Sequence, residues 1–265
     1  MSFAPADRLT QSLRDARTQR VGLVAFLTAG FPSKERFRAD LTEVAAHADV
    51  VEIGVPFTDP MADGVTIQRS SMGALAQGVT LHWIINELAA MPPVKAPLVL
   101  MSYTNPLLAY GLDELAADAA RVGVTGFIVP DLPLEESAAF EAALAVQGVA
   151  LIRMVTPVTP ADRMHKICAG ARGFVYAVTM TGTTGKNMGA ATGDALDPEV
   201  SAYLDALRAM SPVPVCAGFG IRGPAQVRLL DAHTDGVIIG SALVETIERG
   251  ESVAHLLDGL RSTAA

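Results

Sequence analysis

The sequence has only two cysteines, one tryptophan and five histidines among its 265 residues. Cys168 and Cys216 are too few for a disulfide framework, so a small disulfide-stabilised scaffold is excluded. The histidines show no spacing typical of paired metal ligands, and no metal site is predicted. The first residues, MSFAPADRLTQSL, lack the apolar core of a signal peptide. We therefore expect a reduced, cytoplasmic protein.

Long apolar runs and an excess of positive charge are also absent. Apolar residues make up 50% of the chain, yet no stretch approaches the roughly 18 consecutive apolar residues that a spanning helix needs. The 28 acidic residues outnumber the 20 basic ones, giving a net charge of −8, which disfavours a phosphate polymer as a ligand. We expect neither a membrane protein nor a nucleic-acid partner.

Short apolar runs rich in β-branched residues recur along the whole chain. Each run is almost continuously hydrophobic, as a parallel strand buried on both faces requires. The predicted strands cover residues 21–27, 50–53, 98–101, 127–129, 149–154, 174–178, 213–217 and 237–239.

Helical segments separate these runs, some with recognisable starts. Thr159 and Asp197 each precede a proline, as a capping residue precedes the first helical position. We also predict an N-terminal helix over residues 5–19, and residues 64–97 leave room for an extra one. Eight strand–helix units without a linker predict one (β/α)8 barrel, an α/β fold, spanning residues 1–265. A doubly wound open sheet is the alternative.

Two carboxylates near the second predicted strand are the first catalytic candidates. Glu52 lies inside an apolar strand, where desolvation would raise its pKa toward the range useful for proton transfer. Asp63 follows a loop containing Pro56 and Pro60, whose turns would bring it back over the barrel mouth. A structural ion pair at Glu52 and a surface turn at Asp63 are the alternative interpretations.

Glycine-rich segments follow the last two predicted strands. Residues 218–223 read GFGIRG, and Gly240-Ser241 precedes a predicted helix. Only one further strand–helix unit follows the first segment, which argues against a dinucleotide site. In a barrel, these two loops and a helix N-terminus usually bind phosphate, so a phosphorylated small molecule is expected. Glycines that merely permit tight turns are the alternative.

The loop after the sixth predicted strand, residues 179–189, is rich in glycine and threonine. Such a loop is typical of a lid that closes over a ligand, although an ordinary surface loop has the same composition. Tyr176, inside the strand before it, either points at a ligand or fills the barrel.

These residues resemble the tryptophan synthase alpha chain family. The resemblance rests on the block EIGVPFTDPMADG from Glu52 to Gly64, on Thr66-Ile67-Gln68, and on VPDLP over residues 129–133. It extends to FLTAG over residues 26–30 and to both glycine segments, so it covers nearly the whole chain. The sequence departs from the family's common pattern at Met180, often arginine, and at Val65, often proline.

The resemblance implies a retro-aldol cleavage of indole-3-glycerol phosphate to indole and glyceraldehyde 3-phosphate, with no cofactor in this chain. Glu52 would be the general acid/base, and Asp63 would face the indole N–H. The implied substrate-binding residues are Tyr176, Thr184, Gly185, Gly220, Gly240, Ser241, Leu100, Tyr103 and Phe127.

The resemblance also implies a partner. The loop at Asp59 and Pro60 would face a beta chain that uses pyridoxal phosphate and receives the indole, in an alpha2-beta2 tetramer making L-tryptophan. Two alternatives remain open. One is a stand-alone lyase that releases free indole, and the other is a phosphate-ligand-binding barrel without catalysis.

Overall fold

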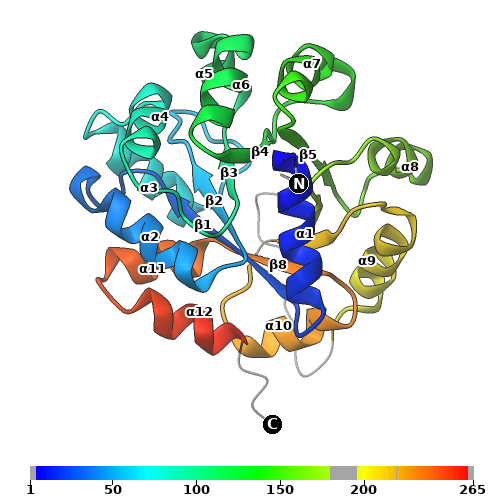
Figure 1. Cartoon of the computed structure of the whole chain (residues 1–265). Helices are drawn as coiled ribbons and strands as arrows, with labels where there is room; N and C mark the ends of the chain where they lie inside the picture. Colours follow the sequence, from blue (N-terminus) through cyan, green and yellow to red (C-terminus); the bar gives the residue numbers. More distant parts are fainter. Residues whose placement is uncertain (1–3, 180–195, 219, 262–265) are drawn as a thin grey trace.

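Eight parallel strands pair in sequence order and close into a barrel, with β1 pairing to β8 (Figure 1). The computed structural model describes residues 4–179, 196–218 and 220–261. The expected α/β barrel is confirmed. The strands are β1 (Gly22–Thr28), β2 (Val50–Gly54), β3 (Leu98–Met101), β4 (Val124–Ile128), β5 (Ala150–Val155), β6 (Val175–Val178), β7 (Val215–Gly218) and β8 (Gly236–Ile239).

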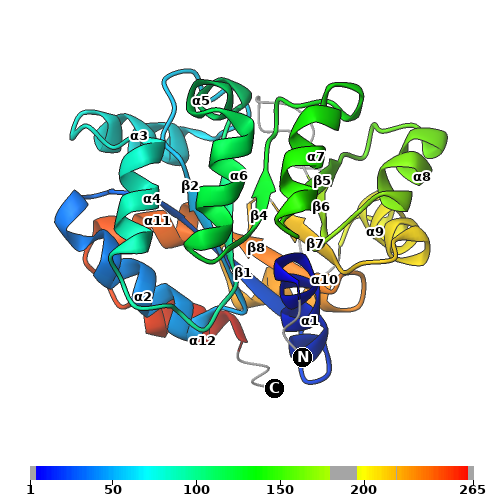
Figure 2. The ribbon, with the colours of Figure 1, turned by 45° about the horizontal axis from the view of Figure 1, so that its top comes forward.

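Helices surround the strands, and Figure 2 shows the same ring from a second angle. The residues predicted to hold an extra helix contain two, α3 and α4. The helices are α1 (Pro5–Arg17), α2 (Phe37–His47), α3 (Val65–Leu75), α4 (Leu81–Ala89), α5 (Thr104–Tyr110), α6 (Leu112–Arg121), α7 (Ala138–Val146), α8 (Ala161–Ala169), α9 (Pro198–Met210), α10 (Pro224–Asp231), α11 (Ser241–Glu248) and α12 (Val253–Arg261), with short 3-10 turns at Lys34–Arg36 and Leu134–Glu136. None of the helices described is long and apolar enough to cross a membrane.

Side chains alternate between the two faces of the barrel wall. On β2, Val50 packs in the barrel interior, whereas Val51 and Ile53 belong to the larger core between strands and helices. Phe26 of β1 and Glu52 of β2 are register partners. Because side chains along a strand alternate with a period of two, Glu52 shares the inner face with Val50.

Helix α1 crosses the N-terminal end of the barrel (Figure 1). Leu9 and Leu13 are fully buried and pack against interior residues such as Phe174 and Cys216. A Cβ at Gly22 would come within 2.9 Å of the Leu13 side chain, so this strand start admits only glycine without displacement. Burying each leucine contributes about 2 kcal/mol, and α1 thereby closes this end.

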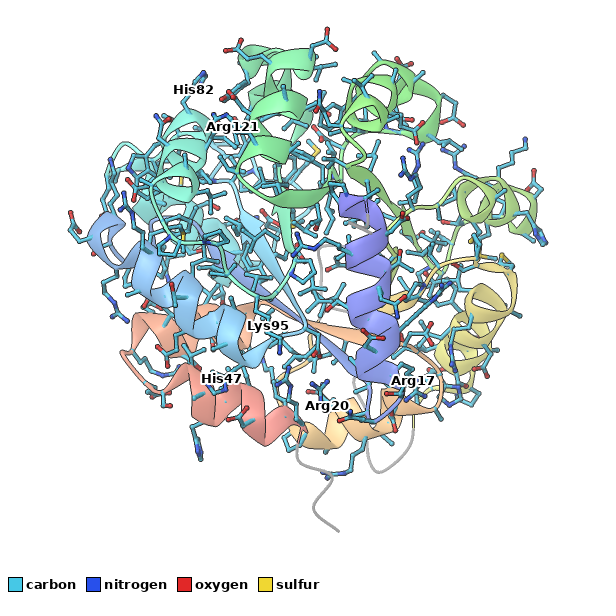
Figure 3. The ribbon with its side chains drawn as sticks, viewed as in Figure 1. Arg17, Arg20, His47, His82, Lys95 and Arg121 are labelled. Carbon is cyan, nitrogen blue, oxygen red and sulfur yellow. The ribbon has the colours of Figure 1, made fainter. Side chains whose placement is uncertain are left out.

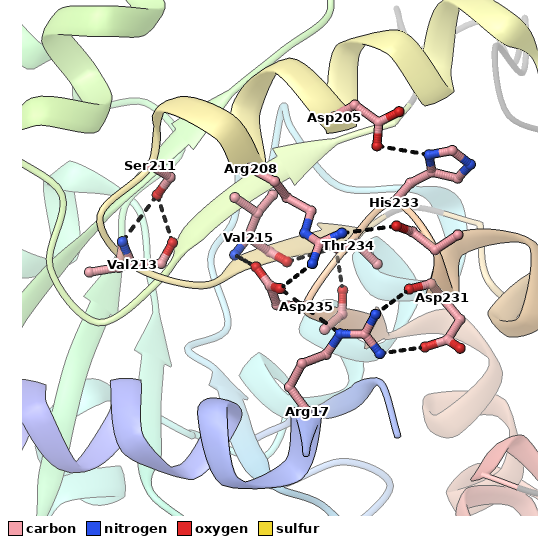
Figure 4. A network of polar contacts seen from close by, with 12 residues as sticks. Arg17, Asp205, Arg208, Ser211, Val213, Val215, Asp231, His233, Thr234 and Asp235 are labelled. Carbon is pink, nitrogen blue, oxygen red and sulfur yellow. Dashed lines mark hydrogen bonds and ion pairs between the residues drawn. The ribbon is translucent and has the colours of Figure 1, made fainter. Parts of the chain in front are cut away.

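Polar contacts fasten the end of α1 to neighbouring elements. Arg17 donates to the Asp231 carboxylate at 2.8 Å and to the Asp231 carbonyl at 2.8 Å, and Arg208 lies 3.1 Å from Asp235 (Figure 4). Figure 3 shows Arg17 and Arg20 together at this end. These pairs are partly exposed, so each adds little free energy. The Arg17 contacts join the end of α1 to α10, and Arg208 joins α9 to the residue before β8.

Among the differences between the predicted and the observed elements, two have a local cause. Strand β4 begins at Val124, three residues before the predicted start at residue 127, because Thr125 and Gly126 interrupt the apolar run. Helix α8 has Pro160 at its N-cap, and the Thr159 hydroxyl accepts from the Thr156 amide instead of capping the helix. The cap at Asp197 is confirmed, since its carboxylate accepts from the Glu199 amide at 2.8 Å.

Candidate active site

A cavity of about 340 Å³ opens where the strands end and the following loops begin. Six of the predicted site residues line it together, contributed by β2, β6, three connecting loops and the first residue of α11. Its lining consists of Phe26, Glu52, Asp63, Gly64, Val65, Thr66, Ile67, Met101, Tyr176, Gly220, Ile221, Arg222, Ile238, Gly240 and Ser241. A larger recess of about 700 Å³ adjoins it beyond Asp63 and Gly64. Glu52 and Gly240 line only the smaller cavity, which is therefore the candidate site.

Glu52 is almost completely buried, with 1% of its surface exposed. Its Oε2 atom has no hydrogen-bond partner among the described residues. Loss of hydration, reinforced by the nearby Asp63 carboxyl, raises the pKa of Glu52 to about 8. A buried carboxyl keeps its proton when water cannot stabilise the charge, so Glu52 is protonated at neutral pH. Among the described residues, no basic side chain forms an ion pair with Glu52.

Asp63 is placed by a tight turn and by a tyrosine. Its amide donates to the Pro60 carbonyl at 3.1 Å, which returns the chain over the barrel mouth as predicted. Burial raises the pKa of Asp63 to about 6, and the hydrogen bond from the Tyr103 hydroxyl opposes that rise. The same hydroxyl accepts from the Ala62 amide at 3.0 Å. Asp63 is therefore mostly ionised at pH 7 while Glu52 is not.

Tyr176 faces the barrel interior from β6. A Cβ at Gly218 on the adjacent strand would lie 2.5 Å from the Tyr176 hydroxyl, so the glycine makes room for the ring. Burial and the proximity of Glu52 and Asp63 raise the pKa of Tyr176 well above its usual value. Tyr176 therefore stays a neutral phenol beside the two carboxyls.

Backbone groups from two loops form the other end of the cavity. Gly220 has a φ of +82°, a conformation that favours glycine. The Gln226 side chain donates to the Gly220 carbonyl at 3.1 Å and accepts from the Arg222 amide at 2.7 Å. Gly240 precedes α11, whose first amides have no partner within the helix. A helix start beside glycines suits a phosphate group.

Comparison with known proteins identifies the family. The model of the tryptophan synthase alpha chain matches residues 13–262. The tryptophan synthase alpha chain of Nitratidesulfovibrio vulgaris (strain DP4) is 45% identical over 255 residues, covering 95% of this chain and 97% of that one. That of Geobacter sulfurreducens is 43% identical over 250 residues, covering 91% and 92%. This chain belongs to the tryptophan synthase alpha chain family.

Solved structures agree with the family. Tryptophan synthase subunit alpha from Legionella pneumophila str. Paris aligns with a TM-score of 0.84 at 30% identity, covering 98% of both chains. A chain of tryptophan synthase from M. tuberculosis, in an aminoacrylate-bound form, aligns with a TM-score of 0.84 at 29% identity, also covering 98% of both.

Two of the side chains expected to line the site of a tryptophan synthase alpha chain do not reach the cavity. Leu100 and Phe127 are fully buried in the core between the barrel and its helices, and Phe127 packs edge-on against Phe140 of α7. Their neighbour Met101 faces inward and lines the cavity with Phe26. The expectation for Leu100 and Phe127 is wrong because both occupy outward positions of their strands.

The remaining predicted residues lie around or outside this region. Tyr103 contacts the site through Asp63 and stacks on Phe57 at 5.0 Å. Asp59 is exposed and Pro60 is partly exposed on the loop before Asp63. Thr184 and Gly185 lie outside the described residues, as does Met180.

Within the described chain, no three His, Cys, Asp or Glu side chains form a group that could hold a metal ion. His47 and His82, labelled in Figure 3, belong to α2 and α4 respectively.

Sequence reasoning missed the apolar walls and Arg222. Phe26, Met101 and Ile238 would have been found by continuing the inward alternation from Glu52 across paired strands. Arg222 lies within the glycine segment that suggested a phosphate site.

Proposed function

We propose that this chain cleaves indole-3-glycerol phosphate to indole and glyceraldehyde 3-phosphate by a retro-aldol reaction. The observation that carries the proposal is the shared cavity: Glu52 and Asp63 face a space whose other end holds Gly220, Gly240 and Ser241. The two carboxyl groups would act on the reacting atoms of the substrate, and the glycine-containing loops would bind its phosphate group. The chain's own step uses no cofactor.

Glu52 would transfer the protons. The protonated carboxyl donates to C3 of the indole ring, and the resulting carboxylate then accepts the proton of the side-chain hydroxyl. The bond between C3 and the glycerol chain breaks, its electron pair returns to the ring, and the hydroxyl carbon becomes the aldehyde. A pKa near 8 supports this cycle, since the residue begins protonated.

Asp63 would stabilise the ring nitrogen. Protonation at C3 leaves positive charge on the indole N–H, and an ionised carboxylate facing it lowers the barrier. A pKa of about 6 leaves Asp63 negatively charged at neutral pH. Tyr103 would hold it in place, and Tyr176 with the side chains of Phe26 and Met101 would enclose the ring.

The phosphate would bind at the opposite end. Backbone amides near Gly220, Gly240 and Ser241 would anchor it at the start of α11. Thr184 and Gly185 remain predicted contributors, Thr184 by positioning Asp63 and Gly185 by binding the phosphate. Uniform anchoring of this kind mainly lowers KM.

A beta chain is the proposed partner, in an alpha2-beta2 tetramer that operates in the cytoplasm. Pyridoxal phosphate would belong to the beta chain, which would receive the indole and make L-tryptophan. Asp59 and Pro60 lie beside Met61, which is 72% exposed, and near Val65, which is 81% exposed. Large exposed apolar side chains close together favour a protein contact, which supports this loop as the contact.

The test is an indole-release assay on the purified chain, with and without a beta chain. Cleavage that accelerates when the beta chain is added supports the proposal. A high rate that no beta chain alters would favour a stand-alone lyase. Binding of the indolyl phosphate without any cleavage under either condition would favour a binding barrel.

A further inference from the structure

A charged side chain at the phosphate end of the cavity has no assigned role. Arg222 lines the cavity with Gly220 and Gly240, and its side chain is 59% exposed. Its Nη1 and Nη2 atoms donate to Glu245 at 3.0 and 3.2 Å. The other guanidinium N–H groups donate to no residue in the described part of the chain.

Arg222 is held by contacts from three elements. Glu245 of α11 also accepts from the Thr66 hydroxyl of α3 at 2.9 Å, so its carboxylate is fixed from both sides. Gln226 of α10 holds the backbone of Arg222. A guanidinium whose position is fixed loses less conformational entropy when it binds an anion.

The charges at this end are otherwise close to balanced. Glu245 neutralises Arg222, and pairing with Arg222 holds the pKa of Glu245 below its usual range. The start of α11 adds partial positive charge. A phosphate dianion entering the cavity would therefore meet a guanidinium whose charge is balanced by Glu245 but which keeps unused N–H donors, together with the partial positive charge of the helix start.

We propose that Arg222 is a specificity-determining residue that binds the phosphate group of the substrate beside the amides of Gly240 and Ser241. The inference rests on the proposed function and adds a side-chain ligand to a site otherwise made of backbone. Glu245 and Thr66 act as positioning residues for the guanidinium. The ligand class is a small phosphate monoester.

The competing interpretation is structural. The contacts joining Thr66, Glu245 and Arg222 would only tie α3 to α11. In that case, removing either charge would disturb the cavity equally. If Arg222 binds phosphate, removing its charge weakens binding, whereas removing the charge of Glu245 does not.

The experiment measures glycerol 3-phosphate binding by titration calorimetry, which needs no catalytic turnover. R222Q is expected to bind about tenfold more weakly, as loss of a charge-assisted contact predicts. E245Q keeps the shape, removes a repulsive charge and is expected to bind a few-fold more tightly. R222K keeps the positive charge but loses the planar guanidinium with its two parallel donors. Its affinity for glycerol 3-phosphate should therefore lie between those of wild type and R222Q.

A matched control is R249Q. This substitution breaks the exposed ion pair between Arg249 and Glu251 at the end of α11, the helix that carries Glu245. It should bind as wild type does. In the cleavage assay, R222Q should raise KM about tenfold with kcat nearly unchanged.

Equal weakening in R222Q and E245Q would assign the cluster a structural role. Wild-type binding together with unaltered binding in R222Q would overturn the inference but leave the proposed function standing. A wild type that binds no glycerol 3-phosphate would overturn both.

Discussion

Glu52 occupies an inward position on β2, among apolar side chains such as Val50 and Phe26 and close to Asp63 and Tyr176. It is 1% exposed, and burying an ionised carboxylate there would cost several kcal/mol. The protein avoids that cost by keeping the proton. The desolvation that makes an ionised carboxylate unfavourable at this position therefore also gives Glu52 the protonation state needed to start the reaction.

Replacing Glu52 with glutamine is expected to lower kcat by at least about a hundredfold, the usual contribution of a positioned acid/base. Affinity for the substrate should change little, because the amide keeps the shape but cannot transfer a proton. Single-turnover cleavage and equilibrium binding measure the two effects. Glu43→Gln, an exposed position on α2, is the control. Near-normal turnover in Glu52→Gln would contradict the assigned role.

The pH dependence follows from the two carboxyls. The active form has Asp63 ionised, with a pKa of about 6, and Glu52 protonated, with a pKa of about 8. We expect kcat/KM to fall below the first value and above the second, giving a maximum near pH 7. Because the groups interact, the two limbs belong to the pair. A flat profile between pH 5 and 9 would be inconsistent with this assignment.

Tyr103→Phe tests the support of Asp63. The tyrosine hydroxyl donates to the carboxylate and lowers the pKa of Asp63, so its removal should move the acidic limb to higher pH. The variant should lose more activity at pH 6 than at pH 7.5. Tyr110→Phe is the control, because its hydroxyl bonds to Asp118 instead. An acidic limb that does not move would show that Tyr103 leaves Asp63 unaffected.

At the scale of elements, two strand-to-helix connections carry the phosphate end. The β7–α10 connection contributes Gly220, and the β8–α11 connection contributes Gly240 and Ser241. A Cβ at Gly240 would come no nearer than 3.9 Å to the Phe26 side chain. Side-chain packing therefore does not require glycine at this position, whereas the proposed approach of a phosphate group to the backbone would.

Gly240→Ala should consequently fold and yet bind substrate poorly. The added methyl group would stand beside the helix start where the phosphate is expected. We predict a KM increase of about tenfold or more with kcat largely kept. Thermal unfolding should show at most about 1 kcal/mol of destabilisation from the changed N-cap. A selective fall in kcat would place this glycine elsewhere in the mechanism.

Residues with unusual chemistry for their position could be predicted from the sequence. Residues whose role depends on which face of a strand their side chain occupies could not. Glu52 stands out because a carboxylate is rare in an apolar strand, and Gly240 because it starts a helix after a strand. Leu100 and Met101 are equally apolar, and only the register of β3 against β2 decides which faces inward. Single-residue register is not encoded in an uninterrupted hydrophobic run.

At the scale of the whole molecule, the barrel was predictable because eight buried parallel strands leave a strong pattern. The boundaries of the individual strands were less predictable. Thr125 sits within β4, where its hydroxyl donates to the Leu98 carbonyl at 2.8 Å. Its polarity is satisfied by a neighbouring strand far along the chain, a contact that local sequence does not reveal.

Stability should also depend on Glu52. In the unfolded chain its pKa is near 4.5, and in the folded chain it is about 8. Below pH 4.5 both states are protonated; as the pH rises toward 8, only the unfolded state releases the proton, so folding becomes less favourable. The loss at pH 8 is at most about 5 kcal/mol.

Glu52→Gln lacks this proton release. Relative to wild type, the variant should therefore gain stability between pH 5 and pH 8, as measured by urea unfolding at both values. Asp63 is present in both proteins, so the difference between them reports the loss of the Glu52 carboxyl together with its interaction with Asp63. Identical pH dependence of the two unfolding curves would contradict a raised pKa at Glu52.

The position of helix α1 limits how the reaction product can leave the barrel. Leu9 and Leu13 fill the space between the strand starts, so the end of the barrel covered by α1 is closed. Indole released beside Glu52 must therefore leave at the opposite end, where the strands finish and the cavity opens. A partner that binds over this open end therefore decides whether the product escapes to bulk water or passes to a second protein.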